Sequence, residues 1–181
     1  MKKILIYLLS IGIFGVASIA NSQTIRIGTE GAYPPWNNLN SAGELEGAEI
    51  DFGNEACKRM GVTCEWVTQD WDGIIPALLQ GKYDIIIAGM SITEERKEKV
   101  NFTTGYMTDG ARFAVLKNSG LANLNIAGMA KVNLNNAGGK EQAAIGQLIA
   151  AMDGKTVCVQ SSTIHQNFLE KHMSGAVDVK L

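Results

Sequence analysis

The sequence predicts an α/β protein with a parallel sheet, because segments of strand and helix character alternate along it. Residues 25–29 alternate apolar and polar side chains, as a half-buried strand does. Residues 83–90 form a short apolar, β-branched run, which is typical of a buried strand in a parallel sheet. In sheets of this kind, ligands bind in the crevice at the carboxyl ends of the strands.

The segment after the first strand is expected to be a loop, followed by a helix. Paired prolines within residues 30–36 stop either regular structure. The helix is expected to begin at Asp51 and to stop at Gly61. Three of its residues share one apolar face at i, i+4 spacing: Phe52, Ala56 and Met60.

A second strand and a second helix follow in the same order. Residues 64–67 predict the strand, and 71–73 form a turn before the helix. Pro76 lies near the first turn of that helix, and Gly81 ends it. The side chains expected to face inward are Leu78 and Leu79.

The segment after the strand at 83–90 is a candidate anion site. Residues 94–99 predict a helix, and Ser91 with Glu94 fits a capping box that leaves first-turn N–H groups free to face a carboxylate. Arg96 can bind both oxygens of that carboxylate. A mixed-charge run of this kind is also typical of a solvated helix face, so the signal is weak when taken alone.

The C-terminal part of the chain predicts a second, unfinished α/β unit. Residues 112–116 predict a strand, and the Asn-, Gly- and Ala-rich segment after them predicts a linker or insertion at 117–139. The further elements expected are a helix at 140–152, a strand at 156–159, a helix at 162–171 and a strand at 177–181. The predicted lobes are therefore 23–116 and 140–181.

The N-terminus has the pattern of a secretory signal peptide, predicted at 1–22. Two lysines precede an apolar run at 4–16, which is too short for a membrane span of about 20 residues, and small residues follow it. Removing Lys2 and Lys3 would leave 14 basic residues against 18 acidic ones, a balance that argues against nucleic acid as a partner. We expect a periplasmic protein.

The cysteines and histidines give structural rather than catalytic expectations. In an oxidising compartment, Cys57 and Cys64 are expected to form a local disulfide. Cys158 is expected to be buried in its strand. His165 and His172 have no metal-ligand spacing, so no metal and no cofactor is expected.

Several motifs follow one another in a fixed order along the chain: Ile-Gly-Thr-Glu-Gly-Ala-Tyr-Pro-Pro-Trp, Gly-Glu-Leu-Glu-Gly, Cys-x6-Cys, Trp-Asp-Gly-Ile-Ile-Pro-Ala-Leu, Gly-Lys-Tyr-Asp and Ser-Ile-Thr-x-x-Arg. On these motifs the chain resembles, from residue 25 to 181, the periplasmic solute-binding proteins of ABC importers for polar and basic amino acids (family 3). It is similar to the lysine/arginine/ornithine- and histidine-binding proteins, and more so to the octopine- and nopaline-binding ones. The resemblance implies a type II fold of two α/β lobes that close on the ligand.

The resemblance also implies a role for each site residue. Arg96 would bind the ligand's α-carboxylate, Glu30 would neutralise a distal cationic group, and small residues at Ala88 and Gly89 would leave room for a bulky ligand. Tyr33 and Trp71 would sandwich the cationic side chain. The polar head of the ligand would meet Ser91 and the backbone near Gly89, and the second lobe would supply Gln160, Ser162 and Thr163.

Three departures from the family pattern stand out. Ser161 replaces a glycine, Ala48 replaces an aromatic residue, and the family continues beyond Leu181 with the rest of its second lobe. The second lobe is therefore expected to be incomplete, and the chain to look like a truncated product.

Two functions of different classes fit these residues. The first is a monomeric binding protein, not an enzyme, that delivers a basic amino acid or an arginine-derived opine to the membrane permease of an ABC transporter. The second is a dehydratase acting on cyclohexadienyl acids such as arogenate, on the same fold. That chemistry needs a general acid, which Glu30 could supply only if burial raised its pKa.

Overall fold

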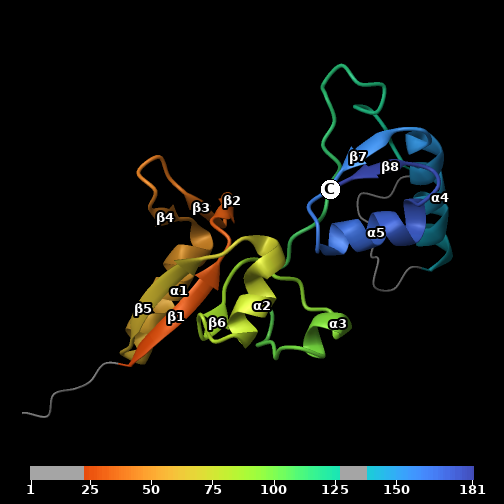
Figure 1. Ribbon diagram of the computed structural model, residues 1–181. Coiled ribbons are helices and arrows are strands. Elements are labelled where there is room, and N and C mark those ends of the chain that lie inside the picture. The colour runs from red at the N-terminus through yellow and green to blue at the C-terminus, as the bar shows by residue number, and fades with distance from the viewer. Residues whose placement is uncertain (1–22, 127–137) are drawn as a thin grey trace, which may run out of the picture.

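The computed structural model describes residues 23–126 and 138–181. It contains two units, which lie side by side in Figure 1. The N-terminal unit comprises elements β1 to α3, and the C-terminal unit comprises α4 to β8. The predicted signal peptide and part of the predicted linker lie outside the described residues. The lobe boundaries at 116 and 140 stay a prediction.

A three-stranded parallel sheet forms the centre of the N-terminal unit. Strand β1 (Thr24–Thr29) pairs on one side with β5 (Thr63–Thr68) and on the other with β6 (Ile85–Ile86). In this register Ile27 lies opposite both Trp66 and Ile85. The predicted parallel arrangement is confirmed. Strand β6 is shorter than predicted and lies at the sheet edge, which leaves Ile85 41% exposed.

Helix α1 (Ala48–Met60) begins three residues earlier than predicted and ends as expected at Gly61, whose φ of 69° is left-handed. The prediction for its apolar face is wrong: Phe52 and Met60 are 49% and 58% exposed. The inward face contains Gly53, where a Cβ would lie 2.6 Å from Trp66 Cζ2. Close packing against β5 therefore sets the buried face, and a glycine gives no hydrophobic signal.

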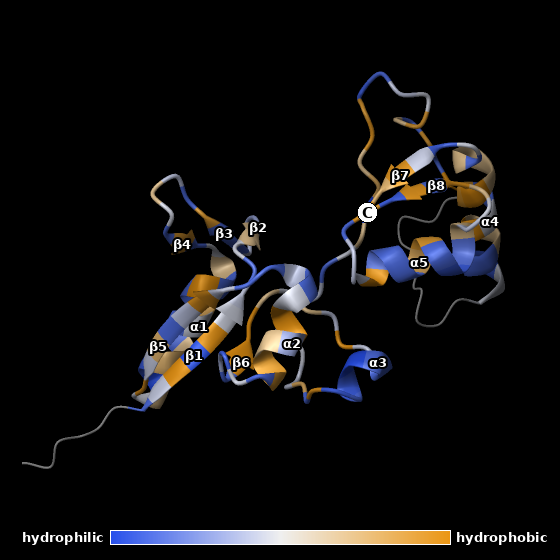
Figure 2. Ribbon diagram, in the orientation of Figure 1, coloured by the Kyte–Doolittle hydropathy of each residue, from blue (hydrophilic) through white to orange (hydrophobic). Residues whose placement is uncertain are grey.

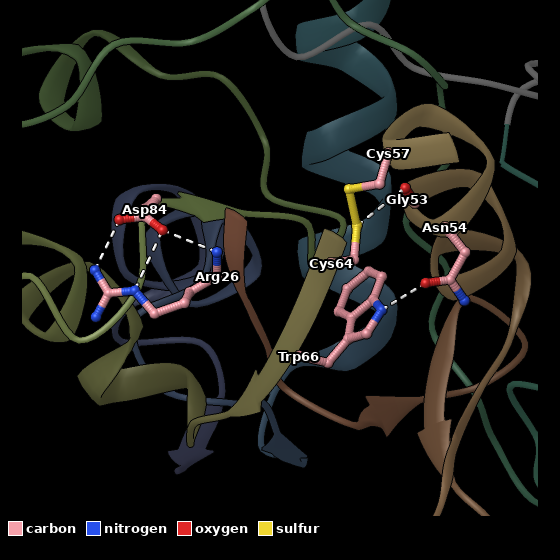
Figure 3. The surroundings of a disulfide bond; sticks show 7 residues. All are labelled: Arg26, Gly53, Asn54, Cys57, Cys64, Trp66 and Asp84. Atoms are coloured by element: carbon pink, nitrogen blue, oxygen red, sulfur yellow. Dashed lines mark hydrogen bonds and ion pairs between the residues drawn. A yellow bond between two sulfur atoms is a disulfide. The ribbon is translucent and has the colours of Figure 1, made fainter. Parts of the chain in front are cut away.

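The predicted disulfide is present and joins α1 to β5. Cys57 and Cys64 have a Cα–Cα distance of 5.9 Å, within the usual range for such bonds. Figure 3 shows the disulfide beside Trp66, whose indole N–H donates to Asn54 Oδ1 at 2.9 Å. On the other side of the sheet, hydrogen bonds from Arg26 to Asp84 lower the pKa of that carboxyl.

The turn at 71–73 is a short 3-10 helix, η1 (Trp71–Gly73), and leads into α2 (Ile74–Leu79). Leu79 does not face inward as predicted but is 61% exposed, because the helix turns Ile74 and Ala77 toward the sheet. The core beneath α2 consists of Ile74, Ala77, Tyr83 and Ala88. Figure 2 shows α2 coloured mainly as hydrophobic, whereas α3 is hydrophilic.

The expected loop at 30–36 contains a short strand. β2 (Ala32–Tyr33) pairs antiparallel with β3 (Asn37–Leu39), which pairs with β4 (Leu45–Glu46). The two prolines form the turn between β2 and β3, and the N–H of Trp36 donates to the carbonyl of Tyr33 at 2.9 Å. The prolines therefore end a strand instead of excluding one.

The strand predicted at 112–116 does not form. Residues 101–116, which follow α3 (Glu94–Lys97), contain no helix or strand. Phe113, Val115 and Leu116 are 43%, 42% and 76% exposed. A strand forms only where another strand lies beside it, and none of the described strands pairs with these residues. The apolar composition of 112–116 therefore gave a wrong prediction.

The C-terminal unit follows the predicted order. It consists of α4 (Gly139–Met152), β7 (Thr156–Cys158), α5 (Ile164–Met173) and β8 (Asp178–Lys180), with β7 and β8 parallel. Its buried core is Met152, Val157, Leu169 and Met173. Cys158 is exposed, contrary to the prediction, because this sheet has only two strands and that face of β7 is uncovered. Within the described residues, no helix has the length and apolar character needed to cross a membrane.

Candidate functional site

The segments that follow the three parallel strands meet at one edge of the sheet. Glu30 follows β1, Trp71 follows β5, and Gly89 follows β6. Because the strands are parallel, their carboxyl ends lie together, and this is the edge where ligands bind in α/β folds. The predicted convergence of these residues is therefore present in the backbone topology.

Arg96 lies at the junction of the two units. Its Nη1 donates to the carbonyl of Ser91 at 2.8 Å, and its Nη2 donates to the carbonyl of Ser162 at 3.1 Å. The guanidinium carbon lies 5.3 Å from the centre of the Trp71 ring, within cation–π range. Burial lowers the pKa of Arg96, although a guanidinium stays charged at neutral pH.

The predicted capping box at Ser91 is wrong. The N-cap of α3 is Thr93, whose Oγ1 accepts from the backbone N–H of Arg96 at 3.2 Å. Ser91 instead supplies its carbonyl to the Arg96 side chain. The helix starts two residues later than that motif requires, so the hydroxyl of Ser91 is not part of its cap.

The turn at 160–163 of the C-terminal unit contacts the N-terminal unit directly. Gln160 Nε2 donates to Glu30 Oε1 at 2.6 Å, and the Trp71 indole donates to the carbonyl of Ser162 at 3.0 Å. Ser161 Oγ lies 2.8 Å from both carboxylate oxygens of Asp72. This turn therefore touches the groups after both β1 and β5.

The hydroxyl of Thr163 has a local role. It donates to the carbonyl of Gln160 at 2.7 Å and accepts from the backbone N–H of Gln166 at 3.2 Å, which caps α5. Thr163 is 8% exposed. Its hydroxyl is thus engaged by the turn itself.

Tyr33 and Gly89 approach each other closely. A Cβ on Gly89, whose φ is 59°, would lie 3.1 Å from Tyr33 Cε1. The Tyr33 hydroxyl donates to Asp109 Oδ2 at 3.1 Å, and burial together with this hydrogen bond raises the pKa of Tyr33. Ala88 is 4% exposed in the core beneath α2, so its side chain does not reach the cleft.

Two pockets flank the contact between the units. One, of about 630 Å³, is lined by Trp71, Arg96 and Ser162. The other, of about 400 Å³, is lined by Tyr33, Gly89 and Ser91. Six of the predicted site residues thus line one or the other of these pockets, which the turn at 160–163 separates by lying against Arg96 and Trp71. The other four line neither pocket: Glu30, Ala88, Gln160 and Thr163.

Residues 25–178 match the family described as bacterial extracellular solute-binding proteins, family 3. The chain belongs to this family.

The similar proteins are named for the amino acids or opines that they bind. The chain is 44% identical over 161 residues to the octopine-binding periplasmic protein of Rhizobium meliloti, a match covering 89% of this chain and 54% of the relative. It is similar, at 40% identity and a TM-score of 0.63, to a periplasmic His/Glu/Gln/Arg/opine family-binding protein from Silicibacter pomeroyi solved with lysine. That match covers 87% of this chain and 57% of the other.

A third comparison concerns the enzyme alternative. An ancestral amino acid-binding protein described as a precursor of cyclohexadienyl dehydratase is 32% identical, with a TM-score of 0.68, over 87% of this chain and 60% of its own. These solved structures confirm the predicted α/β, type II periplasmic-binding-protein fold. This family 3 chain spans about half the length of the curated relative it matches.

Sequence reasoning missed one buried polar residue beside the site. Glu49, on the inward face of α1, is 2% exposed and accepts hydrogen bonds from Asn37 and Gly89. Its partners are distant in sequence, so no local motif marks it; the only signal was a glutamate next to Ile50 at the start of an amphipathic helix. Among the described residues, no group of three or more His, Cys, Asp or Glu is placed to hold a metal ion.

Proposed function

We propose that this chain is an extracytoplasmic solute-binding protein that captures a basic amino acid or an arginine-derived opine for uptake by an ABC transporter. Membership of family 3 and the names of its relatives support the ligand class. In this proposal the chain is exported by the predicted signal peptide at 1–22, acts as a monomer, and delivers its ligand to a membrane permease without catalysing a reaction.

The observation that carries the proposal is that one turn contacts both a carboxylate and a guanidinium. Gln160 binds Glu30, and the carbonyl of Ser162, two residues later, binds Arg96. An amino acid with a basic side chain carries a carboxylate at one end and a cation at the other. Arg96 and Glu30 are complementary to these two charges, and the short turn keeps them within reach of one small molecule.

The other predicted residues complete the proposed site. Trp71 and Tyr33 offer aromatic faces to the cationic side chain, a contact worth about 0.5–2 kcal/mol each. Backbone groups near Gly89 and Ser91 bind the polar head of the ligand. From the second lobe, Gln160 and Ser162 remain the proposed contacts to the ligand, whereas the hydroxyl of Thr163 is engaged within its own turn.

The test is thermal unfolding of the exported full chain with and without arginine, octopine, nopaline, histidine or glutamine. A ligand at 100 times its dissociation constant adds about 2.7 kcal/mol to the free energy of unfolding. We expect one or more cationic ligands to raise Tm while glutamine does not. No shift in Tm with any cationic ligand would contradict the proposal. Turnover of prephenate or arogenate would contradict it too, and would favour the dehydratase alternative.

Replacing Glu30 by glutamine is expected to weaken cationic ligands selectively. Loss of a charge-assisted hydrogen bond costs roughly 1.5 kcal/mol or more, about tenfold in affinity, whereas a neutral amino acid loses little. Calorimetric titration with arginine and glutamine measures both. Glu55→Gln is the matched control, because Glu55 lies on the exposed surface of α1 in an ion pair with Arg59. Equal losses for the two ligands would count against this role.

A further inference from the structure

The carboxylate of Glu49 is buried at the start of α1 and accepts hydrogen bonds on both oxygens. Oε1 accepts from the backbone N–H of Gly89 at 2.7 Å and from the hydroxyl of Tyr106. Oε2 accepts from Asn37 Nδ2 at 2.6 Å. A buried carboxylate is costly unless it is hydrogen-bonded, and here three donors from three separate segments satisfy it.

The direction of this network is determined by Asn37. The backbone N–H of Gly31 donates to Asn37 Oδ1 at 2.8 Å, so the amide nitrogen of Asn37 must face Glu49. Asn37 is fully buried, so no solvent can satisfy the opposite orientation. Both oxygens of Glu49 must therefore act as acceptors, which a carboxylate does and a neutral amide cannot.

The charge on Glu49 has no basic partner among the residues that the structure describes. The ion pairs there involve other residues. Burial and the hydrogen bond to Glu49 raise the pKa of Tyr106 well above its usual range, so this hydroxyl stays a donor. Tyr106 also stacks on Phe52 of α1, with ring centroids 5.3 Å apart.

The three segments held by Glu49 are those that present the proposed ligand groups. Gly31 lies between Glu30 and Tyr33, and Gly89 lies against the Tyr33 ring. Tyr106 belongs to the irregular segment that lines the smaller pocket together with Gly89. A buried charged group often stabilises the fold no more than a well-packed apolar side chain would. The contribution of the Glu49 carboxylate therefore lies in the arrangement that it imposes on its hydrogen-bond donors.

We propose that Glu49 is a positioning residue of the ligand site: its carboxylate holds the Gly89 amide, the Gly31 turn through Asn37, and Tyr106 in one arrangement. The inference rests on the proposed function, because it concerns the affinity of the same site. Glu49 acts through these groups, and it orients the peptide groups that follow β1 and β6 before the ligand binds.

The test is a swap of the carboxylate and the amide, made in the full chain. Glu49→Gln places an amide NH₂ against either Asn37 Nδ2 or the Gly89 N–H, which sets donor against donor. Asn37→Asp places two carboxylates side by side. In the double variant N37D/E49Q, the introduced glutamine donates to the introduced aspartate, whose other oxygen still accepts from Gly31. The polar network is thereby rebuilt with the charge moved by one side chain.

Two measurements read the result: arginine affinity at a temperature where each variant is folded, and the amide resonances of Gly31 and Gly89 in the unliganded protein. We expect Glu49→Gln to weaken arginine on the order of tenfold or more and to shift both resonances. The double variant should return both readouts close to those of the unmodified chain. Glu55→Gln should change neither.

Three outcomes would overturn the inference. The first is Glu49→Gln lowering Tm while leaving affinity and both resonances unchanged, which would make the residue a stabiliser only. The second is a folded double variant that recovers neither readout. The third applies if the unmodified chain binds none of the cationic ligands, in which case the proposed function fails. Resonances of Gly31 and Gly89 that do not move in Glu49→Gln would then overturn the positioning role independently of ligand binding.

Discussion

Replacing Arg96 by alanine is expected to abolish most of the affinity for every ligand of the site. All candidate ligands share an α-carboxylate, and Arg96 is the proposed group that binds it. Loss of two or three charge-assisted hydrogen bonds costs at least about 2–4 kcal/mol, which is on the order of 30-fold or more in dissociation constant. Calorimetric titration with arginine and with octopine measures the change.

Arg96→Lys is the matched control, because it keeps the charge and removes the planar fork. It should fall between the unmodified chain and Arg96→Ala, since lysine cannot bind a carboxylate with two parallel hydrogen bonds. A dissociation constant unchanged in Arg96→Ala would show that another group binds the carboxylate. The proposed site would then be wrong, whatever the ligand class.

Replacing Gly47 by alanine is expected to have the largest effect on stability. Gly47 precedes α1 with φ 126° and ψ 170°, a region that side-chain-bearing residues avoid. A Cβ there would lie 2.3 Å from the carbonyl oxygen of Trp36, which accepts from the backbone N–H of Glu49 at 2.9 Å. Backbone strain and overpacking together cost at least about 2 kcal/mol, or roughly 4–8 °C in Tm.

Two further glycine variants separate the causes of this loss. Gly43→Ala keeps a positive φ, of 79°, but has open space around the new methyl, so it should cost less. Gly146→Ala lies within α4 with nothing within 4 Å and should be neutral or stabilising by about 0.5–1 kcal/mol. Thermal unfolding of the three variants ranks them. A Gly47→Ala loss no greater than that of Gly43→Ala would show that the loop at Trp36 yields to the new methyl.

The order of strands and helices was predictable wherever the signal is local. Strands β1 and β5 and the end of α1 at Gly61 follow from periodicity and from a single glycine. The buried face of α1 was not predictable, because it is set by the close approach of Gly53 on the helix to Trp66 on β5. The strand expected at 112–116 needed a partner strand, and sequence alone does not show whether one lies beside it.

The site was predictable to the extent that its residues follow strand ends. Glu30, Trp71 and Arg96 were predicted because the carboxyl ends of parallel strands converge, and their role in ligand binding stays a prediction. Glu49 was not found, because its donors at positions 37, 89 and 106 lie close together only after folding. Long-range polar networks of this kind leave no spacing pattern in a sequence.

The carbonyl oxygen of Ser162 accepts from both Trp71 and Arg96, and the backbone there has a left-handed φ of 57°. The acceptor is therefore a main-chain atom that every amino acid possesses. Side-chain truncation at this position would leave both hydrogen bonds in place, so an alanine scan would overlook the contact. Weakening that oxygen requires altering the peptide itself, for example by an amide-to-ester replacement of the bond between Ser162 and Thr163. The choice of residue at 162 is then governed by chain conformation, which favours glycine or asparagine over branched residues.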